Sequence, residues 1–228
     1  MPRSPLTDAL ARLGPATVVE RLRPYLTPAR QARIDAVLAA RLDSLQVALE
    51  SPANPHNAAA VVRTCEAMGV IGVHAIAAAS GALTSHDTTR GAYLWVDPRE
   101  HRSLAAFLAW REREGLRLFG AAVDGERELH ELPVDAPACV LLGNEHDGLS
   151  AAAKAACDLR FRIPMFGATE SFNLSVSAAL CLAELAPRRR VLLGAAGDLC
   201  SDRAMALRAR HYAHSVDPRL MAVVLGRP

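Results

Sequence analysis

The feature that most constrains this chain is the alternation of short, continuous apolar stretches with helix-forming segments between residues 45 and 186. Continuous apolar runs of this length are typical of strands that are buried on both faces. The expected strands are LQVALE (45–50), VIGVHAIAA (70–78), YLWV (93–96), LRLFGAAV (116–123), ACVLLG (138–143) and LRFRIP (159–164). The expected helices cover 57–68, 99–113, 149–156 and 173–186. The pattern predicts an α/β fold with a mostly parallel sheet flanked by helices.

Both ends of the chain are predicted to form helical extensions of this α/β domain. Thr27 and Pro28 can cap and open a helix. Its apolar residues share one face: Ile34, Val37, Leu38 and Leu42. Pro187 is expected to end the preceding long helix, and 201–211 to form a basic helix opened by a serine cap. The predicted parts are 1–44, 45–186 and 187–228.

Charge is distributed unevenly along a chain whose formal net charge is only +2. Residues 1–45 hold seven arginines against four carboxylates, and residues 187–228 hold eight against three. The remaining central part is acidic. Basic ends favour contact with a polyanion, although terminal arginines can also serve only to solvate helices.

The sequence carries no signal for a membrane or a metal. No apolar run reaches the roughly 18–20 residues that span a bilayer, and the N-terminal residues lack the apolar core of a signal peptide. We therefore expect a cytoplasmic protein without membrane attachment. The five cysteines are odd in number and widely spaced, so free, mostly buried thiols are expected rather than disulfides or metal ligands.

The first segment that departs from ordinary strand–turn–helix usage is SPANPHNAAAVVRTCEAMGV (51–70). Asn57 is suited to cap the helix, because its side-chain oxygen can accept a hydrogen bond from an orphan backbone N–H. Arg63 follows less than two turns later. A helix N-terminus with a guanidinium forms an anion site that matches phosphate. The alternative is that Asn57 only caps and that Arg63 extends into solvent.

The second segment is VLLGNEHDGLS (140–150), in which an apolar strand leads into a polar quartet between Gly143 and Gly148. Glycines permit a sharp backbone reversal, and ligands of α/β sheets bind where such a loop would lie. The segment lacks the glycine pattern of a dinucleotide site and the G-K-[ST] of a P-loop. His146 and Asp147 fit a solvated turn better than a proton carrier or a metal pair.

The third segment is FRIPMFGATESFNLSVSAALCLAEL (161–185), where Ser171 and Asn173 introduce a nearly uncharged helix. A helix that is apolar on all sides must be buried on all sides. Contact with a second subunit is one explanation, and burial within one domain is the other. Ser171 lacks the G-x-S-x-G setting of a hydrolase nucleophile.

Together the three segments resemble the SpoU (TrmH) family of RNA ribose methyltransferases, of the SPOUT class. The motifs read NPHNAAAVVRTCEAMGV, LLGNEHDGLS and IPMFGATESFNLSVSAAL, and the resemblance covers about residues 45–186. The PHN form and the helical extensions look closest to the subgroup that methylates the guanosine 2′-hydroxyl at position 18 of the tRNA D-loop. The resemblance implies a deep C-terminal trefoil knot and a homodimer formed through it, with the basic ends binding tRNA.

The resemblance also implies the cofactor and the site residues. S-adenosylmethionine would be held by the positions that match the family's contacts: Ala121, Leu142, Gly143, Ile163 and Phe172. The family usually has leucine in place of Phe172 and often glutamine in place of Glu170. The catalytic role falls on Arg63 acting with an RNA phosphate, and the residues placed around it are Asn57, Glu145, Ser171 and Asn173.

Arginine stays protonated in proteins, so we expect Arg63 to clamp the phosphate and stabilise the developing alkoxide rather than to act as a base. The alternatives left open are 2′-O-methylation of ribosomal RNA or of another tRNA position, and a non-catalytic RNA-binding protein with this fold.

Overall fold

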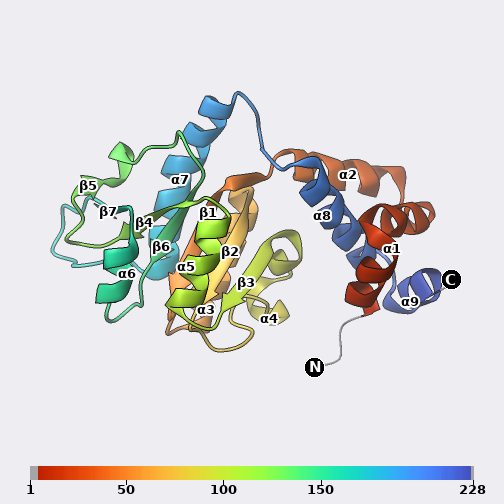
Figure 1. The fold of residues 1–228 in the computed structure, drawn as a ribbon, viewed down its shortest axis with the longest axis horizontal. Helices are drawn as coiled ribbons and strands as arrows, with labels where there is room; N and C mark the ends of the chain where they lie inside the picture. Colours follow the sequence, from red (N-terminus) through yellow and green to blue (C-terminus); the bar gives the residue numbers. More distant parts are fainter. Residues whose placement is uncertain (1–4, 227–228) are drawn as a thin grey trace. The chain divides into compact units, whose positions relative to one another are not determined.

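The computed structural model describes residues 5–226. The chain divides into two units: residues 1–41 with 197–228, and residues 42–196. All the secondary-structure elements described in the first unit are helices, and α1 from the N-terminal part packs with α8 and α9 from the C-terminal part (Figure 1). Its elements are α1 (Pro5–Leu22), the short 3-10 helix η1 (Arg23–Tyr25), α2 (Pro28–Ala39), α8 (Ser201–His214) and α9 (Pro218–Gly226). Helix α1 is kinked at Gly14, which precedes Pro15.

The second unit is built on a parallel sheet whose strand order is β3-β2-β1-β6-β4-β7-β5. The strands are β1 (Leu42–Glu50), β2 (Val70–Ile76), β3 (Asp97–His101), β4 (Arg117–Ala121), β5 (Arg127–Glu128), β6 (Ala138–Leu142) and β7 (Leu159–Arg162). The connecting helices are α3 (Pro55–Met68), α4 (His86–Thr89), η2 (Ala92–Trp95), α5 (Leu104–Arg113), η3 (Leu129–Glu131), α6 (Ala151–Ala156) and α7 (Leu174–Leu193). The α/β prediction is confirmed, and all the strand pairs are parallel.

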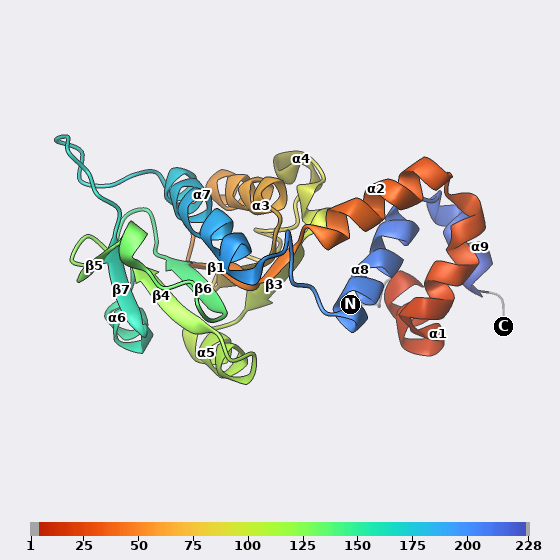
Figure 2. The same ribbon diagram turned by 90° about the horizontal axis from the view of Figure 1, so that it is seen from above.

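Helices cover both faces of the sheet. Helices α3 and α7 lie on one face and α5 and α6 on the other (Figure 2). Val47 and Leu49 of β1 belong to the core beneath α3 and α7, whereas Ala48 between them packs with Phe107 and Trp110 of α5. This two-sided burial explains why the strands are continuously apolar.

The edge of the sheet was predicted wrongly. Residues 92–95 form a 3-10 helix instead of a strand, and the strand that follows, β3, has the polar sequence DPREH. An edge strand has only one neighbour and needs little apolar surface, so hydrophobicity pointed to the wrong stretch. Helix α5 consequently begins at Leu104, where Ser103 Oγ accepts a hydrogen bond from the N–H of Ala106 at 3.2 Å.

Helix α7 does not end at Pro187, as the sequence predicted, but continues to Leu193 and closes at Gly194 in the left-handed region. The three arginines after the proline hold the last turns in place. Their guanidinium groups donate to backbone carbonyls of other segments: Arg188 to Leu132, Arg189 to Val134 and Arg190 to Met68, at 2.7–2.8 Å. These tertiary hydrogen bonds outweigh the break that a proline normally causes.

The helical ends follow the prediction in outline. Thr27 caps α2 by accepting a hydrogen bond from the N–H of Arg30 at 3.2 Å, and Ile34 and Leu38 are buried. Leu42 belongs to β1 rather than to that helix, and α8 extends to His214 with Cys200, not a serine, at its cap position. The five cysteines are free thiols, of which Cys65, Cys139 and Cys181 are buried.

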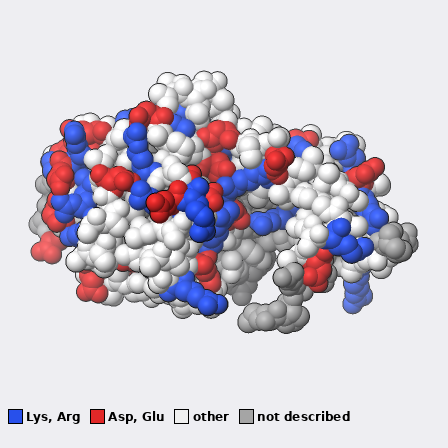
Figure 3. All heavy atoms as spheres, in the orientation of Figure 1, with Lys and Arg blue, Asp and Glu red and all other residues white. Residues whose placement is uncertain are grey.

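Charge differs between the two units. The residues of the first unit include twelve arginines and six carboxylates, whereas the second unit is acidic. In the second unit, acidic and basic side chains are interspersed over the face that Figure 3 displays. Several of its arginines form ion pairs, for example Arg111 with Asp158 and Arg117 with Asp135, both at 2.8 Å. No helix in the described range 5–226 is long and apolar enough to cross a membrane.

Candidate active site

A pocket of about 600 Å³ lies at the carboxyl ends of β4, β6 and β7, which are neighbours in the sheet. Ligands of open parallel sheets bind at this edge. Its walls come from residues 121–123, 142–149, 162–166 and 170–172, with Glu128, Lys154, Leu174 and Ser177. All five residues that the sequence assigned to the cofactor line this one pocket: Ala121, Leu142, Gly143, Ile163 and Phe172.

The loop after β6 closes on itself through backbone contacts. Asn144 and Gly148 exchange two backbone hydrogen bonds, at 3.0 and 2.9 Å, and the Asn144 side chain accepts a third from the N–H of His146. A Cβ atom at residue 143 would lie 2.1 Å from the carbonyl carbon of Gly148, so only glycine fits there. His146 and Asp147 are exposed at the tip, as predicted for a solvated turn.

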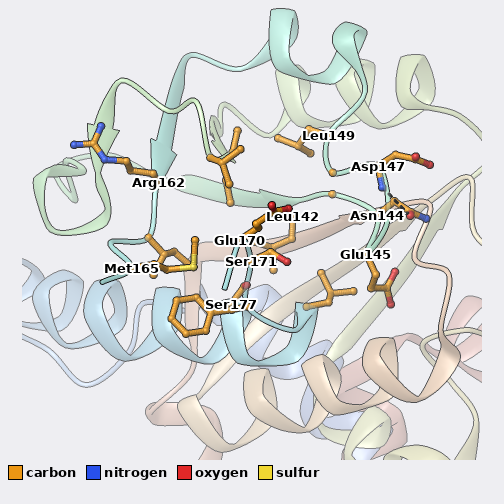
Figure 4. Close-up of a pocket in the computed structure, with 18 of the residues that line it drawn as sticks. Leu142, Asn144, Glu145, Asp147, Leu149, Arg162, Met165, Glu170, Ser171 and Ser177 are labelled. Carbon is orange, nitrogen blue, oxygen red and sulfur yellow. Dashed lines mark hydrogen bonds between the residues drawn. The ribbon is translucent and has the colours of Figure 1, made fainter. Parts of the chain in front are cut away.

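Two side chains of this loop hold the segment that precedes α3. Asn144 donates from Nδ2 to the carbonyl of Ser51 at 2.6 Å. The Glu145 carboxylate accepts from the backbone N–H groups of Ala53 at 2.8 Å and Asn54 at 3.2 Å. Figure 4 shows this carboxylate directed away from Ser171. Asn57 of α3 donates to it from Nδ2 at 2.8 Å. The first two sequence motifs are therefore joined by side chains.

Asn57 is not the helix cap that the sequence predicted. Asn54 takes that position, and its side chain accepts from the N–H of His56 at 2.8 Å. Asn57 lies in the first turn, where it bridges two motifs: it donates to Glu145 and accepts from Asn173 Nδ2 at 3.1 Å. Asn173 in turn caps α7 through Ser175. We call Asn57, Glu145 and Asn173 the amide–carboxylate network.

The electrostatics of Glu145 follow from these contacts. Partial burial acts to raise the pKa of its carboxyl group, but the hydrogen bonds from Asn57, Ala53 and Asn54 outweigh that effect and lower the pKa below its ordinary value. The group is therefore an ionised hydrogen-bond acceptor near neutral pH. A carboxylate with a lowered pKa is poorly suited to remove a proton from a hydroxyl group.

The structure does not bring Arg63 into this pocket. Six residues of α-helix separate it from Asn57, which places the two side chains about 120° apart around the axis and about 9 Å apart along it. Arg63 is exposed and lines a different groove, formed by α3 and residues 89–95. Ser171 does line the pocket, is exposed, and makes no hydrogen bond to any residue in the described range.

Sequence reasoning missed two residues that shape the site. Asn144 closes the loop through its side chain. An asparagine in a glycine-containing loop is a turn signal, because its side chain can bond to the backbone two residues further on. Glu50 ends β1, is 8% exposed, and accepts from the N–H and Oγ of Ser150 at 2.9 and 2.7 Å. A carboxylate at the end of an apolar strand was the signal for it. Ser150 caps α6, so Glu50 fixes the far end of the loop.

The cations at the pocket are already paired. Lys154 contacts Asp124 at 2.9 Å, and Arg162 contacts Glu128 at 2.8 Å. The hydrogen bond from Lys154 is the main reason that the pKa of Asp124 is lowered. Among the described residues, no cluster of three or more histidine, cysteine or acidic side chains is arranged to hold a metal ion.

A parallel-sheet domain with such a pocket at its carboxyl edge, bordered by an ionised carboxylate and an amide pair, belongs to the α/β enzymes that bind a small organic cofactor. The profile of the SpoU rRNA methylase family matches residues 44–183, and the chain belongs to that family. It is an RNA 2′-O-methyltransferase that uses S-adenosylmethionine, with the SPOUT fold. The knotted threading of the chain stays a prediction.

Individual relatives agree with this assignment. The tRNA (guanosine(18)-2′-O)-methyltransferase of Thermus thermophilus is 37% identical over 169 residues, which cover 74% of this chain and 87% of that protein. The TrmH/SpoU tRNA modifying enzyme of A. aeolicus superposes with a TM-score of 0.73 at 27% identity, over 83% of this chain and 98% of that one. The SpoU methyltransferase AviRb of Streptomyces viridochromogenes, in complex with AdoMet, superposes with a TM-score of 0.60 at 27% identity. The match covers 66% of this chain and 62% of that one.

Proposed function

We propose that this chain methylates the ribose 2′-hydroxyl of guanosine 18 in the D-loop of tRNA. The observation that carries the proposal is the convergence of all five expected cofactor contacts on one pocket, with the amide–carboxylate network beside it. The position-18 specificity is supported by the relative from Thermus thermophilus, which has that activity in its name and matches 74% of this chain. Because tRNA is the substrate, we expect the enzyme in the cytoplasm.

The pocket suits S-adenosylmethionine in size and chemistry. A volume of about 600 Å³ lies within the usual range of ligand sites, and Ala121, Leu142 and Ile163 provide apolar walls. When bound, the cofactor supplies an activated methyl group on a sulfonium centre. The protein contributes the position of the groups that meet it. Gly143 keeps the loop closed, and the ionised Glu145 anchors Asn57 and the chain that leads into α3.

Arg63 would act on the RNA rather than on the cofactor. Its guanidinium stays protonated and matches a phosphate in planar, bidentate geometry. Held against the phosphate next to the target ribose, it stabilises the alkoxide that develops as the 2′-hydroxyl loses its proton, and the phosphate offers that proton a way out. Loss of one such electrostatic donor typically costs about 100- to 1,000-fold in turnover.

Because Arg63 lies outside the pocket of its own chain, the catalytic arrangement requires a second copy. Exposed apolar side chains lie along the N-terminal part of α7 and the loop before it: Phe166, Phe172, Val176 and Leu180. An apolar surface of this kind favours burial against another protein surface. We infer that two copies associate through α7 and that Arg63 of the partner subunit completes each pocket.

The helical unit of residues 1–41 and 197–228 would capture the tRNA. Twelve arginines against six carboxylates give it a positive field, and electrostatic binding to the RNA backbone weakens steeply as salt is added. The acidic second unit would then bind nucleic acid only where its pocket and groove require it. Ribosomal RNA is the second candidate substrate, because the family's own description names it.

The test is to incubate the protein with labelled S-adenosylmethionine and total tRNA, and to map the ribose that becomes resistant to alkaline cleavage. We expect one labelled guanosine, at position 18. Label at another nucleotide, label only in ribosomal RNA supplied in parallel, or no label at all would contradict the proposal.

A further inference from the structure

The groove that contains Arg63 is distinct from the pocket described above. It lies between α3 and the segment of residues 89–95 and has a volume of about 690 Å³. Small side chains of α3, those of Ala60, Thr64 and Ala67, form one wall, and Trp95 lines the other side. Two guanidinium groups, those of Arg63 and Arg90, are part of its lining. We call it the Arg63–Arg90 groove.

Neither of these guanidinium groups forms an ion pair or a hydrogen bond with a side chain that the structure describes, a set that leaves out the side chains of residues 5, 86 and 87 within the range 5–226. The two cations of the cofactor pocket, Lys154 and Arg162, are by contrast neutralised by acidic partners. Two guanidinium groups in one concave surface repel each other and favour an anion between them. One carboxylate, that of Glu66, also lines the groove, so its net charge is about that of a single cation.

The backbone at Arg90 adds a second, independent observation. Arg90 has φ 53° and ψ 35°, in the left-handed region that side chains with a Cβ atom rarely adopt. Gly91 follows with φ 77°, and the buried Thr89 donates from Oγ1 to the carbonyl of Ser85 at 2.7 Å. Glycine would adopt this conformation without strain. Arg90 occupies a backbone position that glycine would adopt with less strain, which points to a use for its side chain.

We propose that the Arg63–Arg90 groove binds one phosphodiester of the RNA substrate and that Arg90 is a second ligand of the phosphate that Arg63 holds. Guanidinium groups are well matched to phosphate, and two of them can share its oxygens. The small residues of α3 leave room for the sugar–phosphate backbone to approach the helix. This inference rests on the proposed function in taking RNA as the substrate and Arg63 as a ligand of its phosphate.

The experiment compares Arg90→Gly and Arg90→Gln with the intact protein. Both variants remove the charge, but Arg90→Gly also removes the backbone strain, so it should melt at the same or a higher temperature. We expect both to raise the KM for tRNA about tenfold, with kcat within about threefold and the Kd for S-adenosylmethionine unchanged. In a binding assay without methyl transfer, we plot the logarithm of the tRNA association constant against the logarithm of the salt concentration. The slope should become shallower by the amount expected for the loss of about one phosphate contact.

Arg113→Gln is the matched control, because Arg113 is exposed on α5, across the sheet from the groove, and lines neither cavity. It should leave the KM and the salt slope as they are. A wild-type KM and salt slope in both Arg90 variants would overturn the proposal. So would weakened self-association with unchanged RNA affinity, which would make the groove an interface between copies. The binding assay separates these outcomes from a failure of position-18 methylation, since it needs no turnover.

Discussion

At the residue scale, the carboxylate of Glu145 holds the start of α3, because it accepts hydrogen bonds from three donors in the segment before that helix and in its first turn. Two of these donors are backbone N–H groups and the third is Asn57. Sequence reasoning placed Glu145 in the site but gave Asn57 the role of a cap. The cap position depends on local sequence, and Asn54, directly before Pro55 and the start of the helix, takes it. The contact from Asn57 to Glu145 spans 88 residues of sequence, so no local pattern could reveal it.

Glu145→Gln should destabilise the protein at neutral pH by about 1–2 kcal/mol, after allowance for solvent screening at this half-exposed site. The pKa of the carboxyl is lowered in the folded state, so its contribution to stability is complete well above the ordinary value of 4.5. It is lost as the pH falls through the lower, folded value. Thermal unfolding of both proteins from pH 3 to pH 8 measures this difference.

Glu112→Gln serves as the control for that series, because Glu112 is exposed on α5, across the sheet from α3. Its melting temperature should track the wild type at every pH. A Glu145→Gln difference that stayed constant down to pH 3 would show that the carboxylate charge is not what holds the segment.

At the scale of elements, the loop of residues 143–150 shows why the pocket has its shape. Gly143→Ala would push a Cβ atom into the backbone of Gly148 and Leu149, at 2.1 and 2.3 Å. We expect a loss of about 1–3 kcal/mol in stability and at least a tenfold rise in the Kd for S-adenosylmethionine, because the loop must open. Calorimetric titration and thermal melting provide the two readouts.

Gly167→Ala is a suitable companion, since a Cβ atom there would meet nothing within 4 Å. It should bind the cofactor like the wild type. If Gly143→Ala also bound normally, the closed form of the loop would not matter for the cofactor.

Most elements could be predicted from the sequence, and the failures have physical causes. Strands that are buried on both faces have continuous apolar sequences. The apolar runs therefore predicted five strands correctly: β1, β2, β4, β6 and β7. The polar edge strand β3 carries no such signal, because it pairs on one side only. The end of α7 was missed because the arginines after Pro187 are held by carbonyls far away in sequence.

At the scale of the whole molecule, Arg63 and the cofactor pocket lie apart within one chain. The motifs meet at one edge of the sheet, and the five cofactor positions, which came from resemblance, fall in one pocket. Arg63 does not, because the pitch of α3 turns it away from Asn57. Sequence alone could not reveal this, since it depends on which face of α3 the sheet covers. The central claim of this account is that the partner subunit supplies Arg63.

The most direct measurement of that claim uses two variants that should each have little activity alone when the concentration of S-adenosylmethionine is kept well below the Kd of the weaker binder. Arg63→Ala keeps an intact cofactor pocket, and Gly143→Ala keeps Arg63 but has an impaired pocket. The two proteins carry different affinity tags, are mixed to allow exchange of subunits, and sequential capture isolates the mixed dimers. With random exchange, each mixed dimer holds one complete site, so the mixture should recover about a quarter of wild-type methyl transfer to tRNA.

Recovery of that activity, enriched in the captured mixed dimers, is the result that the account predicts. Mixed dimers that form but transfer no methyl group would contradict it, because they would show that each pocket needs the Arg63 of its own chain.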